Sequence, residues 1–186
     1  MGLLSDMAVG SEQRLAAARA VVSDSELRER CAALPPIPRL RLSTAGFDLI
    51  AELKLRSPAL GDLSAQTVDP VARLRGYAEA GAAVCSILTE PSRFDGDLSH
   101  LRQAATTLAP YGVPAMRKDF LVDPYQVLEA RANGAGGVLL IVRMVERDRL
   151  VAMLDVAAEQ GLFVLLEAFD SHDLELAAEL AAERRG

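Results

Sequence analysis

One unit repeats along most of the chain: an apolar run, a turn, a capped helix and a glycine, followed by the next apolar run. Successive runs start about 24–35 residues apart, which is typical of a strand followed by a helix. An aspartate before a proline marks two helix starts, and a glycine marks three helix ends. The runs begin near Leu49, Val84, Val113, Gly137 and Leu162, the helix starts are Asp69-Pro70 and Asp123-Pro124, and the glycines are Gly81, Gly134 and Gly161.

Two of these runs, 84–89 and 137–142, are too continuously apolar for a strand with one solvated face. They fit parallel strands that are covered on both faces, so the chain is predicted to be an α/β protein. Five runs and a fifth helix over about 171–184 leave two architectures open. The units form either an open doubly wound sheet or the first five units of an eight-unit barrel. A flavodoxin-like sheet places the first strand between the second and third, whereas barrel order is consecutive.

The first quarter of the chain has a different pattern. Residues 11–22 and 24–33 look helical, and Ser23 with Glu26 forms a capping box at the second start. The proline-rich stretch 34–38 cannot be helical and is predicted to be an extended connector. We therefore expect residues 1–46 to be an N-terminal helical extension and linker, and residues 47–186 to be a partial (β/α) barrel domain.

The bulk composition excludes several classes of function. A net charge of −6 without a basic stripe argues against nucleic-acid binding, although a small anionic substrate is possible where cations converge. Cys31 and Cys85 are isolated, so we expect buried reduced thiols in a cytoplasmic protein and no metal site. The N-terminus has no long apolar block, which argues against a signal peptide or membrane span. The sequence contains neither of the glycine motifs that bind nucleotide phosphates, GxGxxG and GxxxxGK(S/T), so a nucleotide cofactor has no support. His100 and His172 are expected on polar helix faces without a ligand role.

The chain has only two lysines, Lys54 and Lys118, among twenty basic residues, and each one closes a predicted strand. A partly desolvated ammonium group can be tuned to exchange a proton, whereas guanidinium cannot. Glu52 lies two residues before Lys54, on the same side of the strand, and Glu167 closes the fifth run. The ends of strands one, three and five meet at one mouth of a barrel, which predicts a Lys/Glu acid–base set there. The alternative is a set of solvated strand ends with fortuitous ion pairs.

Two further residues are candidates for substrate binding. Arg143 follows the fourth run, where it meets either an anion or solvent. Phe94 follows the second run, where it covers the mouth of the barrel or anchors its own loop.

Several stretches resemble the indole-3-glycerol phosphate synthase family, over about residues 47–183. The most distinctive is Arg117-Lys118-Asp119-Phe120-Leu121-Val122-Asp123-Pro124-Tyr125-Gln126-Val127 with 129–131. The others are 50–54 followed by Ser57-Pro58, 86–90 followed by 94–96, 138–141 and 165–167.

The resemblance implies a (β/α)₈ barrel that acts in tryptophan biosynthesis without cofactor or metal. The substrate would be a small phosphorylated anion, a carboxyphenylamino-deoxyribulose phosphate, which undergoes ring closure, decarboxylation and dehydration. By position, Lys118 matches the general acid and Glu167 the general base. Lys54 matches a lysine that contacts substrate and takes part in proton transfer, and Glu52 matches its charged neighbour.

The resemblance also implies that Ser57 and Phe94 line the substrate pocket. At several other positions, however, the sequence departs from the family's pattern. Ala59-Leu60, Asp97 and Phe169 differ from the family's usual residues, and nothing resembles its sixth, seventh and eighth strands. Barrels of this type commonly bind phosphate after strands seven and eight. We therefore expect a chain that lacks the last three units and is weakly active or inactive. Alternatively, the partial barrel is non-catalytic alone and pairs with itself or another chain through its open sheet edge.

Overall fold

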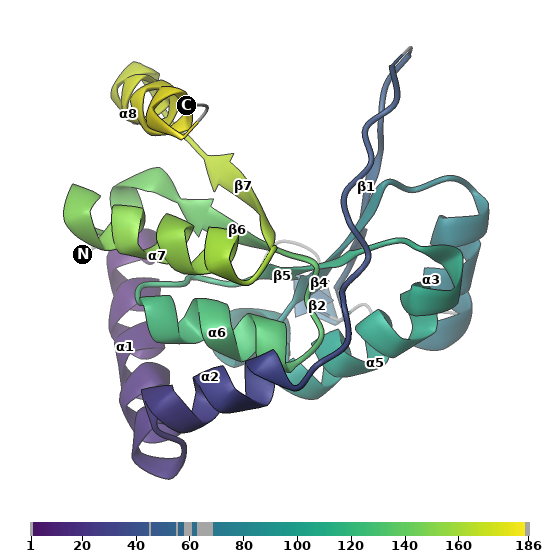
Figure 1. Cartoon of the computed structure of the whole chain (residues 1–186), viewed down its shortest axis with the longest axis horizontal. Helices are drawn as coiled ribbons and strands as arrows, with labels where there is room; N and C mark the ends of the chain where they lie inside the picture. Colours follow the sequence, from purple (N-terminus) through teal and green to yellow (C-terminus); the bar gives the residue numbers. More distant parts are fainter. Residues whose placement is uncertain (1, 45, 55, 58–60, 63–68, 185–186) are drawn as a thin grey trace.

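The computed structural model describes residues 2–44, 46–54, 56–57, 61–62 and 69–184. Within these residues the main sheet has five strands, all parallel, in the order β1-β4-β5-β6-β7 (Figure 1). This consecutive order is that of a barrel and excludes the flavodoxin-like order. The strands span Ile50–Leu53 (β1), Val84–Leu88 (β4), Ala115–Lys118 (β5), Gly137–Ile141 (β6) and Phe163–Glu167 (β7).

The two central runs are buried on both faces, as their sequence predicts. Every residue of β4 and β6 is buried. Side chains alternate between the helix-covered outer face, where Leu53 and Ile87 join the main core, and the inner face, where Val84, Met116 and Leu139 form a second cluster. The sheet therefore has the inner and outer faces of a barrel wall.

Helices follow the strands in alternation and cover the outer face (Figure 1). The predicted capping aspartates are confirmed: Asp69 accepts hydrogen bonds from the backbone amides of Val71 and Ala72, and Asp123 accepts from Tyr125. The predicted helix-end glycines are confirmed by their positive φ angles of 88°, 85° and 69° at Gly81, Gly134 and Gly161. These helices are Pro70–Glu79 (α3), Leu98–Leu108 (α5), Pro124–Ala132 (α6), Arg147–Glu159 (α7) and Ser171–Glu183 (α8).

The N-terminal helices pack on the sheet domain rather than beside it. The second, α2 (Asp24–Ala32), matches its prediction, but α1 (Leu3–Val21) begins well before the expected residue 11. Tertiary packing explains the earlier start, because Met7 is buried and Leu4 packs against the inner-face cluster. Tyr125 of α6 donates hydrogen bonds to backbone carbonyls of α1 and of the residue after it. The boundary at residue 46 stays a prediction.

Several short elements were not predicted, because two to four residues are too few to show periodicity. They are the antiparallel pair β2 (Arg56–Ser57) and β3 (Gly61–Asp62), helix α4 (Pro91–Phe94) and two 3₁₀ turns at Ala109–Tyr111 and Val142–Met144.

Cys31 and Cys85 are buried free thiols, as expected. Burial raises the pKa of both, to about 11 for Cys85, so neither thiol is reactive at neutral pH. In the described part of the chain no helix has both the length and the apolar character needed to cross a membrane.

Candidate active site

Glu52 joins the two lysines of the chain. Its Oε1 lies 2.7 Å from Lys54 Nζ, and its Oε2 lies 3.1 Å from Lys118 Nζ. Glu52 and Lys54 share one side of β1, as their spacing predicts. Lys118 reaches them from β5, two strands away in the sheet, so this second ion pair crosses β4. The geometry thus brings Glu52, Lys54 and Lys118, three members of the expected Lys/Glu set, together at the strand ends.

The cluster is partly shielded from solvent, and this affects the pKa of Glu52. The side chains of Lys54, Lys118 and Glu52 are 38%, 37% and 25% exposed. Burial by itself would raise the pKa of Glu52, but hydrogen bonds and charges from both lysines outweigh it and lower that pKa below its ordinary value. Two ammonium groups and one carboxylate leave a local excess of positive charge, which favours an anionic ligand.

Lys118 and Glu167 line the same hollow, of about 510 Å³. Glu167 is the last residue of β7, and Lys118 is the last residue of β5. The remaining walls are mainly apolar and include Leu88, Phe94, Phe120 and, from the N-terminal helix, Leu3 and Leu4. A lysine and a glutamate thus share one apolar space large enough for a small aromatic molecule.

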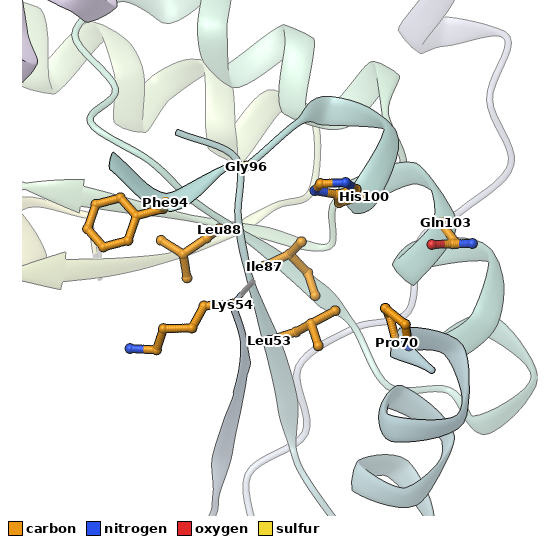
Figure 2. A pocket seen from close by; sticks show the side chains of 9 residues that line it. All are labelled: Leu53, Lys54, Pro70, Ile87, Leu88, Phe94, Gly96, His100 and Gln103. Atoms are coloured by element: carbon orange, nitrogen blue, oxygen red, sulfur yellow. The ribbon is translucent and has the colours of Figure 1, made fainter. Parts of the chain in front are cut away.

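Lys54 lines an adjoining hollow of about 130 Å³ (Figure 2). Leu88 and Phe94 belong to both hollows and form the wall between them. In Figure 2 the Lys54 amine extends to the side where Phe94 lies, away from His100 and Gln103. His100 is half-buried and lines this hollow, so it lies nearer the site than its sequence pattern indicates, whereas His172 is exposed.

Phe94 is held in place by a short helix. Glu90 caps α4 by accepting hydrogen bonds from the amides of Ser92 and Arg93, at 2.9 and 2.7 Å. Phe94 ends this helix, and its ring lies 6.4 Å from that of Phe120, tilted by 32°. The two rings form an aromatic wall of the hollow that Lys118 lines.

A buried network next to Lys118 was missed at the level of sequence. Asp119 accepts hydrogen bonds from Arg14 (2.8 Å), Thr89 (2.8 Å) and Arg117 (3.1 Å). Burial by itself would raise the pKa of Asp119, but the charges of Arg117 and Arg14 lower it below its ordinary value. The signal was present in the sequence, since charged residues on both sides of Lys118 must face the opposite side of β5. The network fixes the end of β5 and so the position of Lys118.

Arg143 does not line either hollow. It binds Asp170 and, at 2.7 Å, Asp173, and its guanidinium lies over the ring of Phe169, 5.3 Å from the centroid. These contacts tie the end of β6 to the start of α8. The side chain of Ser57 lies outside the described residues, and only its backbone in β2 is described.

Within the described ranges, no group of three His, Cys, Asp or Glu side chains is arranged to hold a metal ion. The ammonium and carboxylate groups of the site lie beside an apolar surface, an arrangement that suits proton transfer. Consecutive parallel βα units with such a set at the carboxyl ends of their strands define a barrel-type acid–base enzyme.

Comparison with known proteins identifies the family. The sequence pattern of indole-3-glycerol phosphate synthase matches residues 6–186. The chain is 43% identical to a Nocardioides indole-3-glycerol phosphate synthase, over all of this chain and 71% of the relative. It is 39% identical to that of Saccharopolyspora erythraea and 37% identical to that of Mycobacterium tuberculosis, over 98% and 97% of this chain. The aligned regions make up 67% and 66% of those two relatives.

The chain belongs to the indole-3-glycerol phosphate synthase family, carboxy-lyases of tryptophan biosynthesis with a TIM-barrel fold. The resemblance described from the sequence is thereby confirmed.

Proposed function

We propose that this site performs the acid–base steps that convert a carboxyphenylamino-deoxyribulose phosphate into indole-3-glycerol phosphate. The observation that carries the proposal is the bridging of Lys54 and Lys118 by Glu52, beside the hollow that Lys118 shares with Glu167. Both lysines pair with the carboxylate of Glu52, and both touch space that a substrate can enter.

Lys118 is the general acid of ring closure. As the aromatic carbon attacks the ribulose carbonyl, a carbon–carbon bond forms and the carbonyl electrons move to oxygen, which takes a proton from the Lys118 ammonium. Loss of carbon dioxide then breaks the bond to the carboxyl group and returns its electron pair to the ring. Arginine could not serve here, because guanidinium does not release its proton at neutral pH.

Glu167 is the general base of dehydration. The hydroxyl formed by ring closure leaves as water, with Lys54 taking part in its protonation, while Glu167 accepts the proton that the ring system loses. The separate placement of Glu167 on β7 supports this division, because in the described residues no ion pair joins it to either lysine.

The apolar wall of Phe94 and Phe120 suits the aromatic ring of the substrate, and the excess positive charge of the lysine cluster suits its carboxylate. Ser57 stays a predicted contact. Arg143 is not part of the proposed site, because Asp170 and Asp173 already neutralise it.

We further propose that the 186-residue chain by itself turns over slowly. Barrels of this type commonly hold phosphate with the loops after strands seven and eight, and the five-stranded sheet of the described residues offers no equivalent. Formation of indole-3-glycerol phosphate by the purified chain, with Lys118→Met as the blank, tests both proposals. A rate above the blank but far below that of a relative is expected. No difference from the blank contradicts the acid–base assignment, and a rate equal to that of a relative contradicts the slow turnover.

A second candidate is an assembly role, which the edges of the sheet favour. Among the described strands, β1 and β7 each have only one neighbour. Exposed apolar side chains gather beside these edges, at Phe47, Leu49 and Ile50 near β1 and at Leu165 and Phe169 near β7. Unpaired strands of this kind recruit further strands, from a second copy or from a separate C-terminal piece. Sedimentation of the chain as a stable monomer at high concentration would count against association with a second copy.

A further inference from the structure

Ser86 is a buried hydroxyl without a hydrogen-bond partner. It lies in β4 and is 2% exposed, and it is the one residue in the described part of the chain with a buried side-chain oxygen or nitrogen that is unpaired. Burial of an unpaired hydroxyl costs free energy, so alanine would pack better at this position. Such a local cost inside a site is expected where function needs the group.

The sheet register places Ser86 beside the lysine cluster. Ser86 is the direct neighbour of Glu52 on one side and of Met116 on the other. It is two residues from Val84, which belongs to the inner-face cluster, so its side chain faces the barrel interior, as does that of Glu52. The pair between Glu52 and Lys118 crosses β4 at this level. Ser86 and Glu52 are therefore neighbours on one face of the sheet, and no hydrogen bond joins the hydroxyl to the carboxylate.

In this state both oxygens of Glu52 are engaged. The charged groups that face it in the described structure are Lys54 from its own strand and Lys118 from β5, and Tyr77 of α3 donates to its backbone carbonyl at 3.4 Å. When Lys118 turns to a substrate oxygen and gives up its proton, Glu52 keeps only one donor. A partly buried carboxylate that loses a donor is destabilised unless another replaces it.

We propose that Ser86 is a positioning residue whose hydroxyl donates to Glu52 when Lys118 turns away. The new hydrogen bond holds the carboxylate in place and ionised, so that it recaptures Lys118 after turnover. The inference rests on the proposed function, which supplies the reason for Lys118 to leave.

Substitution of Lys118 by methionine reproduces the departure of the ammonium group. It also leaves Lys54 as the only lysine, so a chain labelled with ¹³Cε-lysine gives one lysine side-chain signal, whose pH titration reports the ionisation of Glu52. We compare the wild-type chain, Ser86→Ala, Lys118→Met and the double variant. Lys118→Gln replaces Lys118→Met should the latter fold poorly.

Ser86→Ala alone is expected to leave the melting temperature unchanged or higher, because the hydroxyl is unpaired in the wild-type state. In the Lys118→Met background the same change lowers the melting temperature by about 2–4 °C, the effect of one lost hydrogen bond. It also moves the midpoint of the Glu52 titration to higher pH. Ser86→Cys, a weak donor, gives an intermediate result.

Equal effects of Ser86→Ala in the two backgrounds, whatever their size, overturn the proposal, because the hydroxyl would then act independently of Lys118. The matched control is Ser11→Ala, which removes a buried hydroxyl that already accepts from Gln126 at 2.9 Å. It lowers the melting temperature alike in both backgrounds and leaves the Glu52 titration unchanged. No step uses synthase turnover, so failure here is distinguishable from failure of the proposed function.

Discussion

Lys118 Nζ lies 3.1 Å from Glu52 Oε2, across the intervening strand β4. The contact joins the first and third strands of the sheet at their carboxyl ends and makes Glu52 the common counter-ion of both lysines. Because the two ammonium groups share one carboxylate, a change at any of the three is felt by the other two.

Lys118→Arg keeps the positive charge but removes the proton donor. We expect residual formation of indole-3-glycerol phosphate to fall by about 100-fold or more, in the usual range for loss of a general acid. The rate is measured by chromatography of the product under saturating substrate. Arg75→Lys, an exposed conservative change on α3, is the control and should leave the rate unchanged. Equal rates for Lys118→Arg and the wild-type chain would remove Lys118 from the mechanism.

Asp119→Asn breaks the buried network behind Lys118. Its side chain is 1% exposed and binds Arg14, Arg117 and Thr89, so the change removes the buried counter-ion that the two guanidinium groups share. We expect a loss of about 3 kcal/mol in the free energy of unfolding, measured by urea denaturation. The matched control Asp155→Asn breaks an exposed pair with Arg184 and should cost about 0.5 kcal/mol or less. A similar small cost at both positions would mean that the network does not stabilise the site.

Gly96→Ala tests the tight turn after α4. A Cβ atom at this position would lie 2.6 Å from the carbonyl carbon of Thr89 and 2.7 Å from the backbone nitrogen of Glu90. Both are backbone atoms, so the end of β4 must move, at a cost of about 1–3 kcal/mol measured by thermal unfolding. Gly76→Ala, in the exposed middle of α3 with open space around it, should instead stabilise the chain by about 0.5–1 kcal/mol. Destabilisation by both substitutions would contradict the steric explanation.

The chain should lose stability in acid. The folded-state pKa values of Glu52 and Asp119 are lowered by their cationic partners, so the stability they contribute is present above the ordinary carboxylate pKa. It is lost as the pH falls from that ordinary value through the folded-state pKa. Melting temperatures measured between about pH 7 and pH 3 should therefore fall, and less steeply for Asp119→Asn than for the wild-type chain. An identical slope for both chains would contradict this assignment.

Much of the fold could be predicted from the sequence, because its signals are local. Asp69-Pro70 starts a helix and Gly134 ends one through the conformation of their own backbone. The unbroken apolar run of β6 likewise marks a strand covered on both faces without reference to distant residues. The longer extent of α1 could not be predicted, since its first turns are stabilised by distant contacts of Leu4 and Met7.

The candidate site was predictable in part for the same reason. The spacing of Glu52 and Lys54 fixes their common side of one strand, so their pairing follows from local geometry. The pairing of Arg143 with Asp170 and Asp173 depends on where α8 begins in space, and the sequence does not encode that locally. The role of Ser86 emerges only from the strand register, which places it beside Glu52. The contact of Asp119 with Arg14 depends on how α1 packs against the end of β5, which the sequence does not encode locally.

The most direct test of the central relationship is a pH titration of the chain labelled with ¹³Cε-lysine, which gives two lysine side-chain signals. We predict that both signals shift with the ionisation of one carboxylate, at the same midpoint below the ordinary glutamate pKa, and that Glu52→Gln removes this shift from both. Signals that titrate independently, or a Glu52→Gln variant that changes only the Lys54 signal, would contradict the shared counter-ion and with it the acid–base site.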